Sequence, residues 1–293
     1  MNKIIVLDWG IFLHRAVFAS VNNPNVPSTY TALSMILGNL KRIGVETEDQ
    51  IIVAVDARHS WRKDYEAEYK GDRKKKRAES PIDWKYHYKK FDELLETLEI
   101  TTNWHIIKID HLEADDIMAV VCRYFKDKEV VLVTYDSDLE QCWAYEHVKI
   151  FSPKSKKWKL KPTNFNAYKL ISKKIQKEVS DNLTSPILNE EDYYTRLTCV
   201  NLLELPEWVE NSVKKDLDNI EDRVYYPEHF PFNGLKERYE NLYNNTKDII
   251  IYEEQLRKAE EKEARKKRKK LEEKAKAKRK KEREAKKLAK EKK

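Results

Sequence analysis

The chain has 293 residues, of which 37% are charged, and its formal net charge is +7. This length allows one full α/β domain and a smaller helical one. No apolar run is long enough for a membrane span, and the chain passes from Met1 almost directly into a hydrophobic run, without a secretion signal. Three cysteines lie far apart without Cys-x-x-Cys spacing, which excludes a disulfide scaffold and indicates a cytoplasmic protein, in the host cytoplasm if it is viral.

The positive charge is concentrated at one end. Residues 253–293 contain 21 Lys or Arg and 10 Asp or Glu, a net charge of +11, which leaves residues 1–252 with −4. This tail consists mostly of Lys, Arg, Glu and Ala and cannot bury a core, so we expect a solvated helix or a disordered segment. It serves either as a solubilising extension or as a source of salt-sensitive affinity for phosphate backbones.

Four short hydrophobic runs in the first half of the chain each end in a carboxylate, at residues 3–8, 51–56, 105–110 and 130–136. Such β-branched runs are typical of buried strands in a parallel sheet. Helical patterns over 30–43, 84–98 and 112–125 supply the crossovers that parallel strands need. The predicted fold class is α/β, with a central, mostly parallel twisted sheet flanked by helices.

Ligands of such sheets gather outside the carboxyl ends of the strands, where acidic side chains of this chain would meet. They are Asp8, Asp56, Glu113, Asp115, Asp136 and Asp138. A single aspartate after a strand is more simply a cap or a turn residue, and one acid of the 113–116 stretch is expected only to cap the following helix. Several converging carboxylates, however, repel strongly unless cations lie between them. Oxygen ligands without paired His or Cys indicate Mg²⁺ or Mn²⁺ rather than zinc.

The connection between the second run and the helix near residue 84 is long and basic. Residues 57–83 carry nine Lys or Arg, interleaved with Trp61, Tyr65 and Tyr69. Long ordered connections are uncommon unless they are functional, and basic residues beside aromatics suit a groove that follows a nucleic-acid backbone. A charge run is also often just a solvated face, and residues 74–77 fit that interpretation.

Ordered motifs over roughly residues 3–215 resemble the 5′-nuclease (flap endonuclease) superfamily, which has a PIN-like fold. The motifs are LDW at 7–9, VDAR at 55–58, WRKD at 61–64, YKGDR at 69–73, EADD at 113–116 and TYDSDLEQ at 134–141, with further similarity at 152–158 and near 205–207. Each motif alone is weak, but their order and spacing are specific. The resemblance is strongest to phage members that act as 5′→3′ exonucleases and flap endonucleases with ribonuclease H activity in primer removal.

The resemblance implies hydrolysis of phosphodiesters with two Mg²⁺ ions, for which Mn²⁺ can substitute. Asp8, Asp56, Glu113, Asp115 and Asp136 would hold the first ion. Lys70 would stabilise the scissile phosphate, Arg62 and Arg73 would bind phosphate, and Tyr69 would stack on a base, while Arg58 would also contact nucleic acid. The implied partners are DNA and RNA–DNA hybrids with 5′ ends or flaps, together with a single-strand-binding protein and a sliding clamp. The protein itself would be a monomer and would not bind membranes.

One family element departs from the pattern. Members carry a Gly-Asp-x-x-Asp-Asn stretch and a glycine-rich helix–hairpin–helix, but the corresponding run here is KEVSDN at 177–182. Glu178 and Asp181, three residues apart, would join Asp138 at the second ion. No glycine lies between Asp72 and Asn233, so the usual grip on duplex is absent or remodelled.

These expectations divide the chain into a catalytic domain over 1–160 with its basic gateway at 57–83, a reduced helical DNA-binding subdomain over 161–252, and the tail over 253–293. Two alternatives stay open. A PIN-type ribonuclease that cuts single-stranded RNA would share the acids but would not need the gateway. A non-catalytic nucleic-acid-binding protein would keep the fold, although an unused cluster of like charges is a stability liability.

Overall fold

The computed structural model describes residues 2–66, 69–71, 77–176, 187, 189–220, 225–244 and 264–265. The chain separates into two compact units, Met1–Asn245 and Thr246–Lys293. Apart from residues 264–265, the predicted tail therefore lies outside the described residues. None of the helices in the described ranges is both long and apolar enough to cross a membrane.

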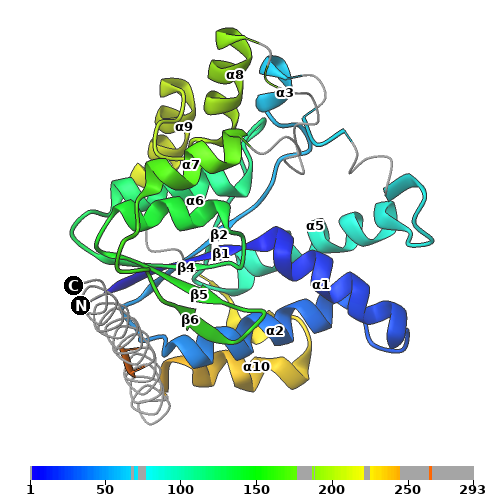
Figure 1. Cartoon of the computed structure of the whole chain (residues 1–293). Helices are drawn as coiled ribbons and strands as arrows, with labels where there is room; N and C mark the ends of the chain where they lie inside the picture. The colour runs from blue at the N-terminus through cyan, green and yellow to red at the C-terminus, as the bar shows by residue number, and fades with distance from the viewer. Residues whose placement is uncertain are drawn as a thin grey trace, which may run out of the picture. The chain divides into compact units, whose positions relative to one another are not determined.

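A six-stranded sheet forms the centre of the first unit (Figure 1). Its strands are β1 (Lys3–Asp8), β2 (Gln50–Ala54), β3 (His105–Ile107), β4 (Glu129–Val133), β5 (Val148–Ser152) and β6 (Lys157–Lys159), in the order β3-β2-β1-β4-β5-β6. The first five strands are parallel, and β6 is antiparallel to β5. The α/β prediction is confirmed, and the four predicted strands match β1 to β4 within about three residues at each end.

Helices cover both faces of the sheet. They are α1 (Trp9–Asn22), α2 (Ser28–Ile43), α3 (Arg62–Tyr65), α5 (Trp84–Thr101), α6 (Ala114–Tyr124), α7 (Ala167–Gln176), α8 (Glu190–Val200), α9 (Glu207–Asp218) and α10 (Asn233–Glu240), with short 3₁₀ helices η1 (Asp138–Ala144), η2 (Pro227–His229) and η3 (Asn241–Asn244). The three predicted crossover helices correspond to α2, α5 and α6. Helix α1, which follows β1 without a break, is not among the predicted patterns.

The sheet separates two hydrophobic clusters, because successive side chains of a strand point to opposite faces. In β1, Ile5 and Leu7 belong to the cluster under α1, α2 and α5, whereas Ile4 and Val6 belong to the cluster under α6. All four side chains are fully buried. Central strands of this kind place their carboxyl ends rigidly, which is the property that a site at that edge requires.

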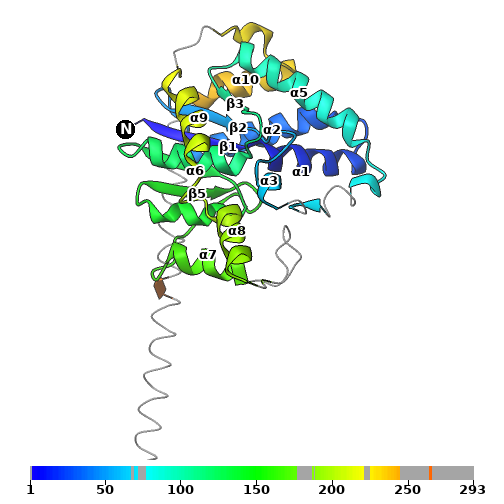
Figure 2. The same ribbon diagram turned by 90° about the horizontal axis from the view of Figure 1, so that it is seen from above.

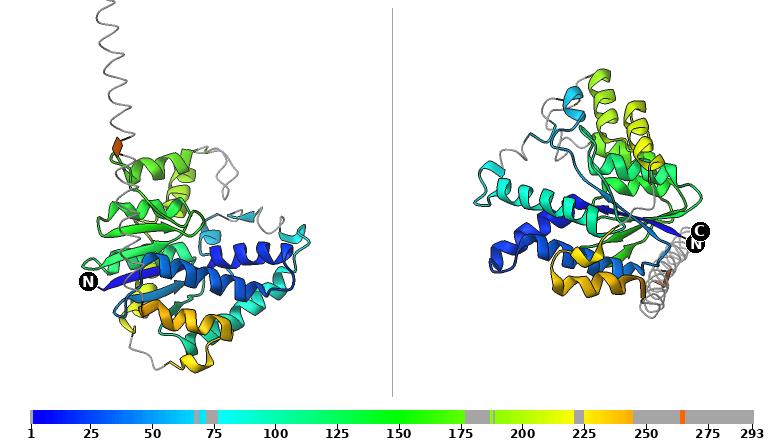
Figure 3. Two further views of the ribbon diagram at one scale, coloured as in Figure 1. Left: turned by 90° about the horizontal axis from the view of Figure 1, so that it is seen from below. Right: turned by 180° about the vertical axis from the view of Figure 1, so that it is seen from behind.

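The segment after residue 161 contributes to both clusters. Val209, Val213 and Leu217, spaced one helical turn apart on α9, pack with the α6 side of the sheet. Leu235 and Tyr239 of α10 pack on the other side, against α2 (Figures 2 and 3). The described part of residues 161–244 thus packs against both faces of the sheet, and the predicted helical subdomain over 161–252 stays a prediction.

Candidate active site

The predicted acids follow the strands at one edge of the sheet. Asp8 is the last residue of β1, Asp56 comes two residues after β2, and Asp136 comes three residues after β4. The chain runs outward from β1 through β2 to β3 and then returns to β4 on the other side of β1. Asp8 and Asp136 therefore flank the topological switch point, where ligands of open α/β sheets bind.

Asp8 and Asp56 face each other across Gly10. A Cβ atom at Gly10 would lie 3.0 Å from Oδ2 of Asp56 and 3.6 Å from Oδ1 of Asp8. A side chain at this position would have to push into the two carboxylates, so glycine keeps the space between them open. Asp8 also accepts hydrogen bonds from the amide of Ile11 (3.4 Å) and the hydroxyl of Thr134 (3.1 Å). These bonds join β1, α1 and the end of β4.

Asp56 connects this pair of strands to the first turn of α6. Its Oδ1 accepts a hydrogen bond from the backbone amide of Ala114 at 2.9 Å, between Glu113 and Asp115. The amino end of a helix favours negative charge. The third acidic motif is thereby placed beside the first two, although β3 itself lies two strands away from β1.

Mutual repulsion among the acids marks them as one electrostatic cluster. Burial raises the pKa of Asp8 to about 7, with further raising contributions from the charges of Asp56 and Asp136 and an opposing contribution from the Thr134 hydrogen bond. Burial also raises the pKa of Asp115 well above its usual range, and Asp136, Asp8 and Asp56 raise it further. Asp8, Asp56, Asp115 and Asp136 thus converge, as the sequence predicts.

Glu113 belongs to the same edge but is compensated by cations. Its carboxylate is bonded by the ammonium of Lys70 (2.5 Å), the hydroxyl of Tyr69 (2.9 Å) and the guanidinium of Arg62 (3.2 Å). Although burial acts in the opposite direction, Lys70 and Arg62 hold the pKa of Glu113 below its usual value. Glu113 is therefore a fixed carboxylate, whereas Asp8 and Asp115 are held near other negative charges.

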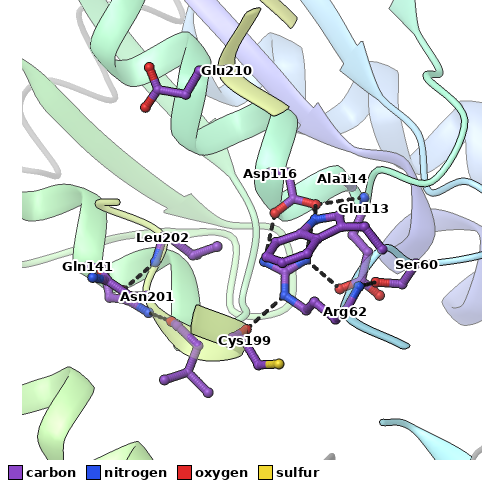
Figure 4. A network of polar contacts seen from close by, with 12 residues as sticks. Ser60, Arg62, Glu113, Ala114, Asp116, Gln141, Cys199, Asn201, Leu202 and Glu210 are labelled. Carbon is purple, nitrogen blue, oxygen red and sulfur yellow. Dashed lines mark hydrogen bonds and ion pairs between the residues drawn. The ribbon is translucent and has the colours of Figure 1, made fainter. Parts of the chain in front are cut away.

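Arg62 differs from its predicted role as a phosphate ligand. Its side chain is 1% exposed, and its guanidinium binds both oxygens of Asp116 (2.6 and 3.0 Å) and the carbonyl of Cys199 (2.7 Å). Figure 4 shows Arg62 between Asp116, Glu113 and the end of α8. The guanidinium makes these hydrogen bonds, and one to Glu113, in the protein interior. Arg62 therefore positions Glu113 and joins α3 to α6 and α8.

Tyr69 also differs from its predicted role. The ring is 4% exposed, with the Lys70 ammonium 5.1 Å and the Arg62 guanidinium 6.0 Å from its centroid. Neither face is open for a base to stack on. Lys70 itself is partly exposed and adopts a left-handed backbone conformation (φ 56°), which is strained for a residue with a Cβ and is most often found at functional sites.

Two other predicted gateway residues lie elsewhere. Arg58 is exposed and approaches Asp92 at 3.8 Å, so it is accessible from solvent. Arg73 lies outside the described residues, as do Glu178 and Asp181, the two acids predicted for the second metal ion.

The acids after β4 are held by a tight turn. The amide of Asp138 donates to Oδ1 of Asp136 (2.9 Å), and the amide of Asp136 donates to Thr134 Oγ1 (3.0 Å). Both carboxylates are partly exposed. The ammonium of Lys174 on α7 forms an ion pair with Asp138. Asp138 is thus close to the other acids, but its charge is balanced by Lys174 of α7.

Three residues, Asp116, Thr134 and Lys174, support the site although the sequence assigned them no part in metal or phosphate binding. Asp116 is fully buried and accepts hydrogen bonds from the Trp61 indole (3.0 Å), the Glu113 amide (2.9 Å) and Arg62. It is the capping acid expected within residues 113–116. Thr134 and Lys174 carry no local signal, since their partners are distant in sequence. The Trp61-Arg62 pair could have been found from its apolar–basic alternation beside a capping acid.

The donor set fits a hard divalent cation. Carboxylate oxygens from four segments meet there, and the repulsion among Asp8, Asp56, Asp115 and Asp136 would be relieved by positive charge. Within the described ranges, no three acidic, His or Cys side chains form a complete metal-binding group. A cation would therefore draw the carboxylates closer together and would compete with Lys70 and Lys174 for Glu113 and Asp138.

Comparison with known proteins gives consistent matches. The model of the "5′-3′ exonuclease, N-terminal resolvase-like domain" family matches residues 3–174. Ribonuclease H of Enterobacteria phage T4 is 27% identical over 169 residues, which cover 56% of this chain and 55% of that protein, so the chain spans about half the length of this relative. Crystal structures of the bacteriophage T5 D15 protein with metal ions, and of this flap endonuclease as a pseudo-enzyme-product complex with DNA and metal ions, cover 75% of this chain and 100% and 99% of the solved chains. Their TM-scores are 0.57 and 0.58 at 16% identity, which shows a shared fold.

Proposed function

This chain belongs to the 5′-3′ exonuclease family through its N-terminal resolvase-like domain, and on that premise we propose that it is a metal-dependent 5′→3′ exonuclease and flap endonuclease with ribonuclease H activity. Its substrates would be the 5′ ends of RNA–DNA hybrids and flapped duplexes, in primer removal during phage-type replication. The resemblance inferred from the acidic motifs is confirmed by the family and by the T4 relative.

The observation that supports the proposal most directly is the convergence of Asp8, Asp56, Asp115 and Asp136 at the switch point. Carboxylates whose charges raise the pKa of Asp8 and Asp115 are costly to keep together unless they serve a charged ligand.

We infer that the acids hold two Mg²⁺ ions, for which Mn²⁺ can substitute. Asp8, Asp56, Asp115 and Asp136, with Glu113, would hold the first, and Asp138, with Asp181 and Glu178, the second. When bound, such ions lower the pKa of water and stabilise the leaving oxygen. The protein keeps the carboxylates in place by the Gly10 gap, the Ala114 amide and the turn at Asp136.

Three basic residues are proposed to meet the nucleic acid. Lys70, partly exposed at the rim of the acids, would release Glu113 and stabilise charge on the scissile phosphate. Arg58 is accessible for a more distant phosphate, and Arg73 stays a predicted phosphate ligand. The role of Arg62 and Tyr69 is then to hold Glu113 rather than to touch substrate.

Cleavage of end-labelled substrates tests the proposal. The full chain should release short products from the 5′ end of a flapped duplex and of an RNA–DNA hybrid when Mg²⁺ is present, and excess EDTA should stop both reactions. Undiminished cleavage in EDTA would contradict a metal-dependent mechanism. Preferential cleavage of single-stranded RNA would instead favour a PIN-type ribonuclease, and tight binding without cleavage would favour a non-catalytic protein.

A single-strand-binding protein and a sliding clamp, the protein partners that the resemblance implies, stay predictions. A monomeric state likewise stays a prediction, and light scattering of the full chain measures it.

A further inference from the structure

A cationic cavity lies where α1, α2, α10 and the β5–β6 hairpin meet. Its volume is about 220 Å³. Four of the side chains that line it are basic and come from these four elements, namely Arg15, Arg42, Lys156 and Arg238. Figures 1 and 3 show α10 lying along α2, which brings residues about 200 positions apart in sequence to the same cavity.

The positive charges in this cavity are not neutralised by acids. Arg15 donates to the carbonyl of Pro153 (2.9 Å) and Arg42 to that of Gly38 (2.6 Å). Arg238 donates to the hydroxyl (2.8 Å) and the carbonyl (3.0 Å) of Ser34. These acceptors are uncharged, and across the described ranges no carboxylate forms an ion pair with any of the four basic residues. Neighbouring like charges without counterions repel, so an anion would be bound favourably.

Gly38 shapes the floor of the cavity. A Cβ atom here would lie 3.2 Å from Nη1 of Arg42 and 3.6 Å from Nη2 of Arg238. Both guanidinium groups therefore lie close to the backbone of α2 at Gly38, where no side chain separates them from the helix. The planar donor forks of arginine match phosphate oxygens, which accept two parallel hydrogen bonds.

The β5–β6 hairpin joins the cavity to the sheet edge at which the acids lie, because Pro153 follows β5, and β5 is parallel to β4, which precedes Asp136. Tyr135, between Thr134 and Asp136, is 37% exposed and has the ammonium of Lys154 from this hairpin 6.0 Å from its ring centroid. Burial and the charge of Asp8 raise the pKa of Tyr135, while Arg15 lowers it, so this residue lies within the field of both sites. Arg15 is seven residues beyond Asp8 in sequence, a rise of roughly 10 Å along α1.

We propose that this cavity binds a backbone phosphate of the nucleic-acid strand that enters the active site. The proposal rests on the proposed nuclease function and adds a second anchoring point to it. The cavity, at about 220 Å³, has room for a phosphate group.

A phosphate explains the site better than an acidic protein segment does. The guanidinium groups match the oxygens of a phosphate, and the proposed function already brings a strand with one phosphate per nucleotide to the acids at the sheet edge. A nucleic-acid strand must in any case reach those acids, together with the cations that compensate them. One bound phosphate at the cavity would fix the register of that strand without reading its sequence, as phosphate contacts do.

The test measures binding of a fluorescein-labelled 5′-flap duplex to the full chain in EDTA, where no metal-dependent cleavage occurs, over a range of salt. The double variant Arg42→Gln/Arg238→Gln should raise the dissociation constant. The affinity of both proteins should fall when the salt concentration is raised from 50 to 200 mM. The fall should be about 3.5-fold smaller in the variant for each phosphate that the variant no longer binds. The control Lys149→Gln/Lys214→Gln removes the same charge from exposed residues, which pair with Glu129 and Glu210.

The single variant Arg238→Gln serves as a second test in which misfolding is not expected. Because Arg238 is exposed, the thermal unfolding midpoint of this variant should match that of the wild type. An unchanged dissociation constant and salt slope in both variants would overturn the phosphate site and leave the cavity to an acidic protein segment. An equal loss in the control would also overturn it. Absence of Mg²⁺-dependent cleavage by the wild type, by contrast, concerns the proposed function and not this site.

Discussion

The two halves of the acidic site are built in opposite ways. On one side, Glu113 is buried and bonded by Arg62, Tyr69 and Lys70, and Asp116 behind it is fully paired. On the other side, Asp136 and Asp138 are partly exposed and held by backbone amides of a short turn, with Lys174 as a cation from α7.

This difference separates rigid from adjustable ligands. The Glu113 half is preorganised, because moving it would break buried charge-assisted hydrogen bonds. The Asp136 half can shift when a cation binds, because it is partly exposed and is held by a bond within one turn and by the single cation of Lys174. The acids with raised pKa, Asp8 and Asp115, both feel Asp136. Metal binding would therefore change the open half more than the paired half.

The largest expected effect follows from removing charge in the open half. Asp136→Asn keeps the Oδ1 atom that accepts the Asp138 amide, so the turn is preserved while one negative charge is lost. We expect single-turnover cleavage of a 5′-flap substrate in Mg²⁺ to slow by about two to three orders of magnitude. Asp127→Asn, an exposed aspartate before β4 at the opposite edge of the sheet, is the matched control and should cleave normally.

The same variant should be the more stable one without metal. The folded-state pKa of Asp8 is raised to about 7, so Asp8 contributes stability at pH below about 4 that is lost as the pH rises through about 7. The raised pKa of Asp115 acts in the same direction. Thermal unfolding in EDTA should give a lower midpoint at pH 8 than at pH 5, and Asp136→Asn should reduce this difference. If Asp136→Asn cleaved at the wild-type rate, Asp136 would not be a metal ligand.

The second prediction breaks the paired half. Arg62→Ala leaves the buried carboxylate of Asp116 without its main partner, and losing one partner of a buried ion pair costs about 3–5 kcal/mol of unfolding free energy. Arg58→Ala, four residues earlier and exposed, should cost less than about 1 kcal/mol. Urea unfolding followed by circular dichroism measures both. If the two variants were equally stable, Arg62 would not be a buried ion-pair partner, and the phosphate-binding role predicted from its motif would stand.

The sheet and the meeting point of the acids are predictable from sequence because both depend on local pattern. Buried parallel strands appear as short β-branched runs, and their carboxyl ends share one edge, so these runs alone suffice to place Asp8, Asp56 and Asp136 together. The apolar periodicity of α6 locates its first turn, which adds Glu113 and Asp115 to the same edge.

The pairing of the charges is not predictable in this way. A basic residue in a motif looks alike whether it faces substrate or the interior, and only the packing of α8 against α3 decides that Arg62 is covered. Lys174 and Asp138 are 36 residues apart, so no local period joins them. The same limit applies to the cavity, since Arg42 and Arg238 meet only after α10 packs on α2.

The smallest predicted effect distinguishes the two cations that cover the acids, one in each half. Lys70→Ala should slow the chemical step by roughly a hundredfold while weakening substrate binding much less, because a cation aimed at developing phosphate charge acts mainly in the transition state. Lys174→Ala should change the rate at saturating Mg²⁺ little and should lower the Mg²⁺ concentration needed for half-maximal activity, because Asp138 loses its competing partner. Single-turnover rates and Mg²⁺ titrations of both variants, with unfolding midpoints as a check on folding, measure the two effects separately. A Lys70→Ala rate within twofold of wild type would make Lys70 only a partner of Glu113, and the rigid half of the site would then contribute no charge to the reaction beyond its metal ligands.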